Sequence, residues 1–383
     1  MRNLLRICLL TFSMLLLAAA VASADSGAHV PVLKQYRAAF LQWYPQTFTG
    51  NGLDKPRCIA FDGSHIWVGN SDGNSVSVFN ATDGTPATSF GINGVITGNG
   101  LNYPNGMAFD GSHVWVANQR GGSVSVFNAS DGSPATSFGT NGVITGNGLA
   151  GPEGIAFDGN RIWVAGGDVS VFNAADGTPA TGFGTNGVIT GNGLSGPRGI
   201  AFDGSHIWVT NQSGGSVSVF NAADGTPATG YGTNGVITGY GLSGPSGIAF
   251  DGNHIWVVNH RHTPDTVCVF NAADGTPATS FGTNGVLTIN GKSACISESI
   301  AFDGSHIWVS SGGDTGDTYY GPPAVNVFNA ADGTPATGYG TNGLITGNGL
   351  NEPCGMAFDG ANMWATDEGY TGYGLTRIPV LQY

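Results

Sequence analysis

Short runs of alternating hydrophobic and polar residues, separated by turn residues, make up most of the chain. Residues 216–220, for example, read S-V-S-V-F and are followed by a turn at 221–225. An alternation with period two predicts β-strands, and the repeated part of the chain shows no period of 3.6 residues. We therefore expect an all-β protein.

The pattern itself recurs along the chain. The motif A-F-D-G-x-x-(I/V/M)-W starts at Ala60, Ala108, Ala156, Ala201, Ala249, Ala301 and Ala357, with spacings of 48, 48, 45, 48, 52 and 56 residues. In the fourth copy the pattern predicts strands at 200–202, 206–210 and 216–220, and an outer strand within 226–237. Four antiparallel strands in such a period are typical of a β-propeller blade, so we predict a seven-bladed β-propeller.

The two ends of the repeated region predict how the ring closes. The last copy stops after its third strand, and the segment 46–58 (QTFTGNGLDKPRC) matches 187–199 (GVITGNGLSGPRG), which leads from an outer strand into the next blade. An N-terminal strand should therefore complete the seventh blade and remove the exposed sheet edges. We assign residues 25–383 to this one domain and expect a monomer.

The first 24 residues have a different pattern. Arg2 and Arg6 precede an apolar run, and Ala22-Ser23-Ala24 fits a signal-peptidase site. We interpret residues 1–24 as a secretory signal peptide; the alternative is a membrane anchor, for which the apolar run is short. We predict an extracytoplasmic protein that is periplasmic, secreted or on the cell surface, with no transmembrane segment after cleavage.

Charge excludes some classes of partner. Losing Arg2 and Arg6 would move the formal net charge from -13 to -15. Nucleic acid and anionic membrane surfaces are poor partners for such a chain. Only 10% of the residues are charged, and 65 of the 383 are glycine, so the surface should consist mainly of neutral polar side chains and tight turns.

Two stretches resemble known repeat families. Residues 207–225 (IWVTNQSGGSVSVFNAADG) are similar to the repeats of YVTN-type propellers, and 196–204 (GPRGIAFDG) with FNAADG also resemble NHL repeats. The resemblance covers nearly the whole chain after residue 24 and implies a propeller fold. It implies little about function, because such propellers include surface-layer proteins, binding scaffolds, lyases and hydrolases.

Residues that occur in every copy are best interpreted as scaffold. The seven motif tryptophans should fill the gaps between blades, and the motif Asp-Gly pairs suit hairpin turns. Five motif copies also carry a histidine two residues before the tryptophan, and ring-related histidines would point apart instead of converging on one metal ion.

Function should lie where the copies differ. The residue two positions before the inner-strand Ile or Met differs between blades and should ring the channel mouth: Arg57, Asn105, Glu153, Arg198, Ser246, Glu298 and Cys354. The loops between the second and third strands are longest in blades 5 to 7, at residues 259–266, 310–324 and 366–376. We therefore predict a cleft on the mouth face that binds a protein or glycan ligand, a role that Tyr-rich loops favour. The candidate ligand-binding residues are Arg57, Asn105, Glu153, Arg198, Glu298, His260, His262, Tyr319, Tyr320 and Tyr370.

Metal binding is the alternative for the same loops. Asp314, Asp317, Asp367 and Glu368 could hold Ca2+ together with loop carbonyls. His260 and His262 with Glu298 could instead hold a transition metal that activates water, as in a metal-dependent lyase or hydrolase of the NHL-like propeller type. No nucleophile elbow or phosphate-binding loop occurs. We assign no catalytic residue and favour a binding propeller over an enzyme.

Four cysteines remain after residue 24. Cys58 replaces the glycine that opens the inner strand of blade 1, and Cys354 lies one position earlier in blade 7. These blades are neighbours at the ring closure, so a Cys58–Cys354 disulfide would latch the ring. Cys268 and Cys295 are the second predicted pair. The alternative is that the thiols are free, buried and packed as small apolar groups.

Overall fold

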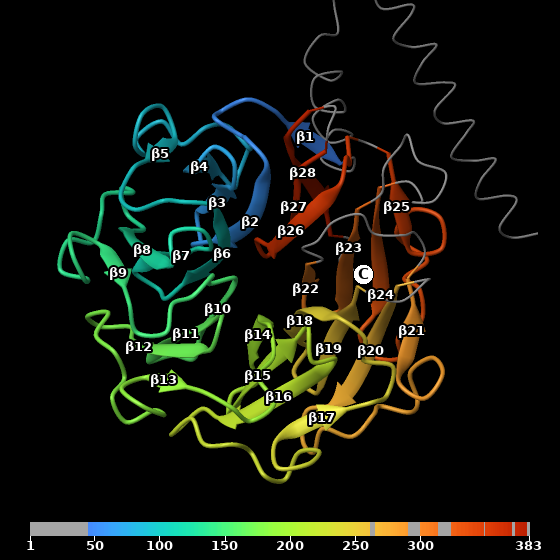
Figure 1. Cartoon of the computed structure of the whole chain (residues 1–383). Helices are drawn as coiled ribbons and strands as arrows, with labels where there is room; N and C mark the ends of the chain where they lie inside the picture. The colour runs from blue at the N-terminus through green and yellow to red at the C-terminus, as the bar shows by residue number, and fades with distance from the viewer. Residues whose placement is uncertain are drawn as a thin grey trace, which may run out of the picture. The chain divides into compact units, whose positions relative to one another are not determined.

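Seven four-stranded antiparallel sheets follow one another around a ring (Figure 1). The structure is a computed structural model, and it describes residues 45–260, 265–289, 299–312, 323–347, 349–369 and 372–380. These residues belong to the unit Pro45–Tyr383 and contain strands but no helix. The predicted seven-bladed β-propeller is confirmed.

Each blade runs from an inner strand at the channel to a short outer strand. Blade 1 consists of β2 (Pro56–Phe61), β3 (His65–Asn70), β4 (Ser75–Asn80) and β5 (Val95–Thr97); blade 2 of β6 (Pro104–Phe109), β7 (His113–Asn118), β8 (Ser123–Asn128) and β9 (Val143–Thr145); blade 3 of β10 (Gly154–Phe157), β11 (Arg161–Ala165), β12 (Val169–Asn173) and β13 (Val188–Ile189); blade 4 of β14 (Pro197–Phe202), β15 (His206–Asn211), β16 (Ser216–Asn221) and β17 (Val236–Thr238).

The remaining blades follow the same order. Blade 5 consists of β18 (Pro245–Phe250), β19 (His254–Asn259), β20 (Thr266–Asn271) and β21 (Val286–Thr288); blade 6 of β22 (Ile300–Phe302), β23 (His306–Ser311), β24 (Ala324–Asn329) and β25 (Leu344–Thr346); blade 7 of β26 (Pro353–Phe358), β27 (Asn362–Asp367), β28 (Gly374–Pro379) and β1 (Gln46–Phe48). In blade 4 the outer strand lies at the far end of its predicted window, because residues 222–235 form successive turns instead.

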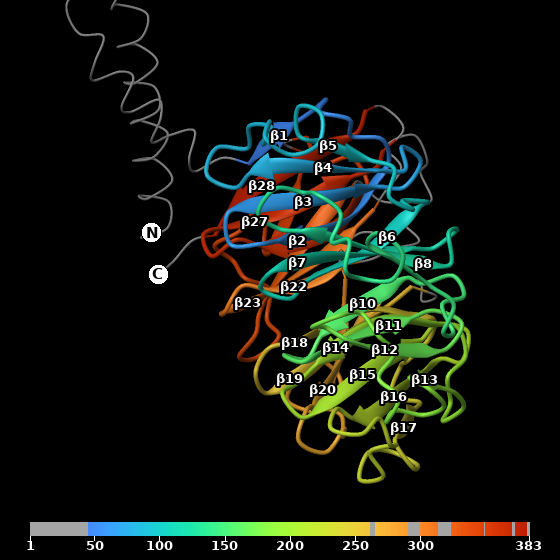
Figure 2. The ribbon, with the colours of Figure 1, turned by 90° about the vertical axis from the view of Figure 1, so that its left-hand side faces the viewer.

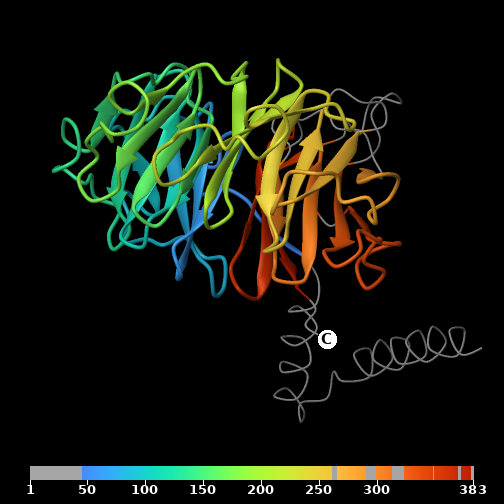
Figure 3. The ribbon, with the colours of Figure 1, turned by 90° about the horizontal axis from the view of Figure 1, so that it is seen from below.

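The N-terminal strand closes the ring as predicted. Strand β1 pairs antiparallel with β28, with Thr47 opposite Thr376, and the inner strands β2 and β26 are in contact. Figure 2 shows β1 beside β28, and Figure 3 shows the blue and red ends of the propeller unit side by side. The last blade therefore combines strands from both ends of the unit.

One aspartate holds each inner hairpin together. In blade 1, Asp62 Oδ1 accepts the backbone N–H groups of Ser64 at 2.7 Å and His65 at 2.6 Å. Its Oδ2 accepts the indole N–H of Trp67 at 2.7 Å, and Trp67 is fully buried. The same tryptophan-to-aspartate bond recurs in the other six blades at 2.7 to 2.8 Å.

The repeated tryptophans and histidines pack around an outer aromatic ring. Trp67 meets Phe90 edge to face, with ring centroids 5.4 Å apart. His65 contacts the same phenylalanine ring at 4.7 Å and places Nδ1 3.1 Å from Asp62. An aromatic contact of this kind stabilises by about 1 kcal/mol beyond burial, so both repeated side chains are part of the scaffold.

Neighbouring inner strands approach so closely that most blades need glycine there. A methyl group on Gly154 would collide with the carbonyl oxygen of Arg198 in the next blade, and one on Gly199 would collide with that of Ser246. Cys58 occupies this position in blade 1.

Cys58 and Cys268 are free, buried thiols, so the predicted Cys58–Cys354 and Cys268–Cys295 disulfides are both wrong; Cys295 itself lies outside the described residues. Burial raises the pKa of the Cys58 thiol to about 12 and that of the Cys268 thiol to about 11. Both thiols therefore stay protonated and poorly reactive at neutral pH.

Each cysteine replaces a residue of the repeat. Cys268 stands where blade 4 has Ser218: it accepts a hydrogen bond from Asn259 Nδ2 at 3.0 Å and donates one to the carbonyl of Tyr240 at 3.1 Å. Cys58 lies opposite Gly69 across β2 and β3, whereas blade 2 pairs a glycine with an alanine at this place. The Cys58 sulfur fills the space that a β-carbon on residue 69 would need.

Because the Cys58 sulfur fills the space beside Gly69, substitutions at positions 58 and 69 should have non-additive effects on the free energy of unfolding. Gly69→Ala should destabilise the protein by roughly 1 to 3 kcal/mol, because the new methyl group collides with Cys58 Sγ. The double variant Cys58→Gly/Gly69→Ala, which reproduces the pair found in blade 2, should recover most of that loss. Urea unfolding of both single variants and the double variant would measure the coupling, and additive effects would contradict it.

Candidate functional site

A pocket of about 200 Å3 lies at the channel, where the inner strands begin. Its lining includes five of the predicted mouth residues: Arg57, Asn105, Glu153, Arg198 and Ser246. They belong to five consecutive blades, which confirms their placement around one opening. Glu298 lies outside the described residues, and Cys354 is fully buried.

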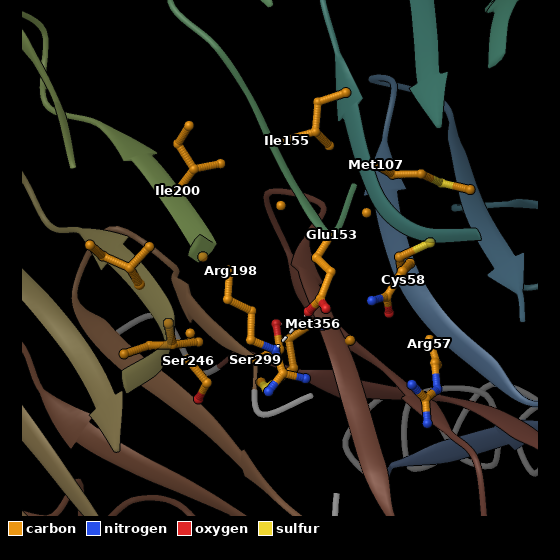
Figure 4. A pocket seen from close by; sticks show the side chains of 18 of the residues that line it. Arg57, Cys58, Met107, Glu153, Ile155, Arg198, Ile200, Ser246, Ser299 and Met356 are labelled. Carbon is orange, nitrogen blue, oxygen red and sulfur yellow. Dashed lines mark hydrogen bonds and ion pairs between the residues drawn. The ribbon is translucent and has the colours of Figure 1, made fainter. Parts of the chain in front are cut away.

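Glu153 links three blades at this opening. Its Oε2 lies 3.0 Å from Arg198 Nε, and its Oε1 accepts a hydrogen bond from Gln119 Nε2 at 2.6 Å. Figure 4 shows Glu153 and Arg198 extending toward each other in the middle of the pocket. The charges of this pair are therefore largely neutralised within the protein.

A second ion pair joins blade 7 to blade 1. Arg57 donates from Nε to Glu368 Oε2 at 2.8 Å and from Nη2 to Oε1 at 3.3 Å. The exposed fractions of the two side chains are 8% and 6%. The Arg57 guanidinium also lies 5.3 Å from the ring centre of Tyr103. The Arg120 guanidinium lies 3.8 Å from the same ring centre. This buried two-pronged pair joins the same two blades that the predicted disulfide was to connect.

Asn105 differs from these paired side chains. It lines the pocket from blade 2, and its Oδ1 is buried without a hydrogen-bond partner among the described residues. A buried carbonyl oxygen in this state costs about 1 to 3 kcal/mol unless water or a ligand donates to it. Asn105 Oδ1 is thus a buried acceptor at the mouth whose hydrogen bond has to come from water or from a ligand.

The candidate metal residues of blade 7 have partners of their own. Asp367 Oδ2 accepts from Thr376 Oγ1 at 2.6 Å, and Oδ1 accepts from the backbone N–H of Asn351 at 3.1 Å. Blade 1 has Asn70 at this position, and its oxygen likewise accepts a backbone N–H, that of Asp54. Asp367 therefore occupies a structural asparagine position, and Glu368 is bound to Arg57.

Of the other predicted loop residues, one lies within the described part of the chain. His260 is described, and its backbone N–H donates to the carbonyl of Gly244 at 3.2 Å. His262, Asp314, Asp317, Tyr319, Tyr320 and Tyr370 lie outside the described residues. Within the described ranges, no three His, Cys, Asp or Glu side chains converge on a possible metal position.

The sequence analysis missed Gln119 and Tyr103. Gln119 directly follows Asn118, the last residue of β7. It therefore occupies the same position in blade 2 as Glu368 does in blade 7. Tyr103 has a φ of 59° and directly precedes Pro104. Blades 3, 4 and 5 have glycine at the position of Tyr103. Both departures are visible when the copies are aligned with one another, and both lie beside a mouth residue.

The fold places the protein in the class of seven-bladed β-propellers. No protein-family model matches the chain, and no curated protein sequence matches it. The YVTN or NHL type of the repeat therefore remains a prediction.

Solved structures share the fold at low sequence identity. The Myceliophteria thermophila Cps50 (Swd1) β-propeller domain is 12% identical, with 88% of this chain and 100% of that chain covered and a TM-score of 0.59. A streptogramin B lyase is 15% identical over 88% and 98% of the two chains, with a TM-score of 0.55. The computationally designed protein Ika8 is 12% identical over 86% and 98%, also with a TM-score of 0.55. These similarities extend to the fold alone.

Within the described ranges, no helix is long and apolar enough to cross a membrane.

The buried carboxyl of Asp367 predicts a pH-dependent effect. Burial raises its pKa from 3.8 to about 7, so between these values the folded protein holds a proton that the unfolded chain has lost. This contribution makes the protein less stable as the pH rises from 4 to 7. Asp367→Asn should therefore stabilise the protein at pH 8 by on the order of 2 kcal/mol and change little at pH 4. Urea unfolding across this pH range would test it; a difference independent of pH would contradict it.

The ion pair at the closure predicts a large coupling energy. Glu368→Gln or Arg57→Met alone should cost about 3 to 5 kcal/mol, because each leaves a buried group without its partner. The double variant should lose clearly less than the sum. A double-mutant cycle by urea unfolding measures this difference, and a coupling below about 0.5 kcal/mol would show that the pair is not acting as a unit.

Proposed function

We propose that the protein is an exported recognition propeller that binds a protein or glycan ligand at the channel mouth, through Arg57, Asn105, Glu153 and Arg198. The observation that carries the proposal is the gathering of blade-specific side chains around one pocket. The scaffold elsewhere repeats nearly unchanged, and the amino-terminal segment 1–24 has the pattern of a secretory signal.

The contacts at the mouth favour a neutral, polar ligand group. Arg57 is paired with Glu368, and Arg198 is paired with Glu153, so little net charge remains to attract an ion. Asn105 Oδ1 can accept a hydrogen bond. A pocket of about 200 Å3 admits only the tip of a ligand, so the rest of the ligand would lie across the mouth face.

The proposal also includes the loop residues that the sequence pattern singles out. They are Glu298, His260, His262, Tyr319, Tyr320 and Tyr370, of which only His260 lies within the described residues. Tyrosine supplies a large contact area at little cost in side-chain entropy. These loops would hold the larger part of the ligand.

The test is to screen the full chain on an array of oligosaccharides and peptides and then compare two asparagine variants. Asn105→Leu keeps the size of the side chain but removes the acceptor, and it should weaken binding of the captured ligand about tenfold. Asn160→Leu is the matched control, because Asn160 is exposed in a hairpin turn of blade 3. The control should bind as the unaltered chain does.

Equal loss in both variants, or no loss in Asn105→Leu, would exclude the channel mouth as the binding site. Circular dichroism and thermal unfolding of each variant would establish that the fold is retained.

A further inference from the structure

Two grooves lie at equivalent places in blades 2 and 7, away from the channel. The blade-2 groove has a volume of about 600 Å3, and the residues that matter for its chemistry are Asn74, Leu101, Asn102, Ser123, Val143 and Thr145. The blade-7 groove has a volume of about 380 Å3 and includes Thr47, Thr49, Leu350, Asn351 and Tyr373.

The repeat itself builds these grooves. The G-N-G-L segment that leads into blades 1, 2, 3, 4 and 7, and its G-Y-G-L counterpart in blade 5, pass directly over the outer strand of the same blade. Gly100 has φ of 73°, and a β-carbon there would press on Val143 of β9 at 2.8 Å. Gly349 faces Thr47 of β1 in the same way. Glycine is needed here for both the left-handed backbone and the close approach.

The blade-2 groove offers short, uncharged polar groups beside apolar ones. Asn102 and Thr145 are exposed. Among the described residues, none forms a hydrogen bond with the side-chain amide of Asn102 or with the hydroxyl of Thr145. Val143 is half-buried and forms apolar surface next to them, whereas Leu101 is buried in the core beneath. The groove lining contains no charged side chain.

The blade-7 groove repeats this chemistry with different residues. Thr49 takes the place of Thr145, Asn351 that of Asn102, and Leu350 that of Leu101. Tyr373 adds an aromatic ring at the position of a blade-2 loop glycine, and this lining is also without charge. Asn351 is half-buried, and its Nδ2 donates to the carbonyl of Gly372 at 3.3 Å. The two grooves therefore share an exposed threonine hydroxyl beside an asparagine, and Tyr373 supplies the apolar surface in blade 7.

We propose that these blade grooves are binding sites for neutral saccharides, distinct from the channel mouth. A sugar ring presents hydroxyl groups that both donate and accept, which matches exposed amides and hydroxyls. Its C–H faces match the valine of the blade-2 groove and the tyrosine ring of the blade-7 groove. Anionic sugars are disfavoured, because the groove linings contain no cation and the chain has a formal net charge of -13.

Two such grooves on one ring make the binding multivalent. The position of Asn102 is Asp54 in blade 1, Ala150 in blade 3, Ser195 in blade 4 and Ser243 in blade 5, so the amide is confined to blades 2 and 7 among these blades. Sites that face the same way around a ring can engage one branched or surface-bound glycan together, and this raises the overall affinity without new contacts.

The experiment measures the number of bound sugars per chain by native mass spectrometry. The probes are maltotriose, cellotriose, mannotriose and N,N′,N″-triacetylchitotriose, with trigalacturonate as the anionic control. We expect at least one neutral trisaccharide to bind at two or more sites per chain and trigalacturonate to bind at least about tenfold more weakly.

Paired variants then locate the sites. Asn102→Leu/Thr145→Val removes the hydrogen-bonding groups of the blade-2 groove at nearly constant volume and should abolish one site. Tyr373→Leu should remove or weaken a different one. Asn160→Leu/Thr185→Val alters exposed positions outside both grooves and should leave the number unchanged.

Several outcomes would overturn the proposal. They are no binding of any neutral probe at millimolar concentration, preferential binding of trigalacturonate, or a number of sites that the groove variants do not change. A single site lost in Asn105→Leu but kept in the groove variants would place the sugar at the channel mouth, so the proposed function would stand while this inference failed.

Discussion

The hydrogen bond from a buried tryptophan N–H to an aspartate carboxylate is the interaction on which every blade depends. A buried indole N–H without an acceptor would cost about 1 to 3 kcal/mol, and the aspartate that removes this cost also holds the backbone of the inner hairpin turn. One side chain therefore sets both the turn and the position of the largest core residue. Because this unit occurs in all seven blades, the segments outside it are free to differ.

The blade number and the ring closure could be predicted from the sequence, because both follow from counting a repeat and comparing its ends. The outer strands were less predictable, since most of their window consists of turns. The alternative of free, buried thiols is the correct one for Cys58 and Cys268, because each sulfur fills a place in the repeat instead of meeting another cysteine. Cys58 is matched by Gly69 across the strand pair, and Cys268 replaces a serine in a repeated network. Aligning the strands of the copies would have revealed both exchanges.

The candidate site was predictable in position but not in its contacts. Variation between copies located Arg57, Asn105, Glu153 and Arg198 at the mouth, yet the partners of two of them come from neighbouring blades. Glu368, assigned to a metal ion from its charge alone, neutralises Arg57. Asp367 occupies an asparagine position of the repeat. A carboxylate in a variable loop is therefore weak evidence for a metal site when an arginine of the next blade lies within reach.

These pairings limit how the mouth can change. Glu153 contacts Gln119 on one side and Arg198 on the other, so replacing it alone would leave two groups in adjacent blades without a partner. Asn105 has no such partner among the described residues, and the exposed Asn102 and Thr145 of the blade-2 groove are similarly independent. Changes at these positions break no ion pair between blades, so ligand preference can change there at lower cost in stability than at Arg57, Glu153 or Arg198, whose partners would have to change with them.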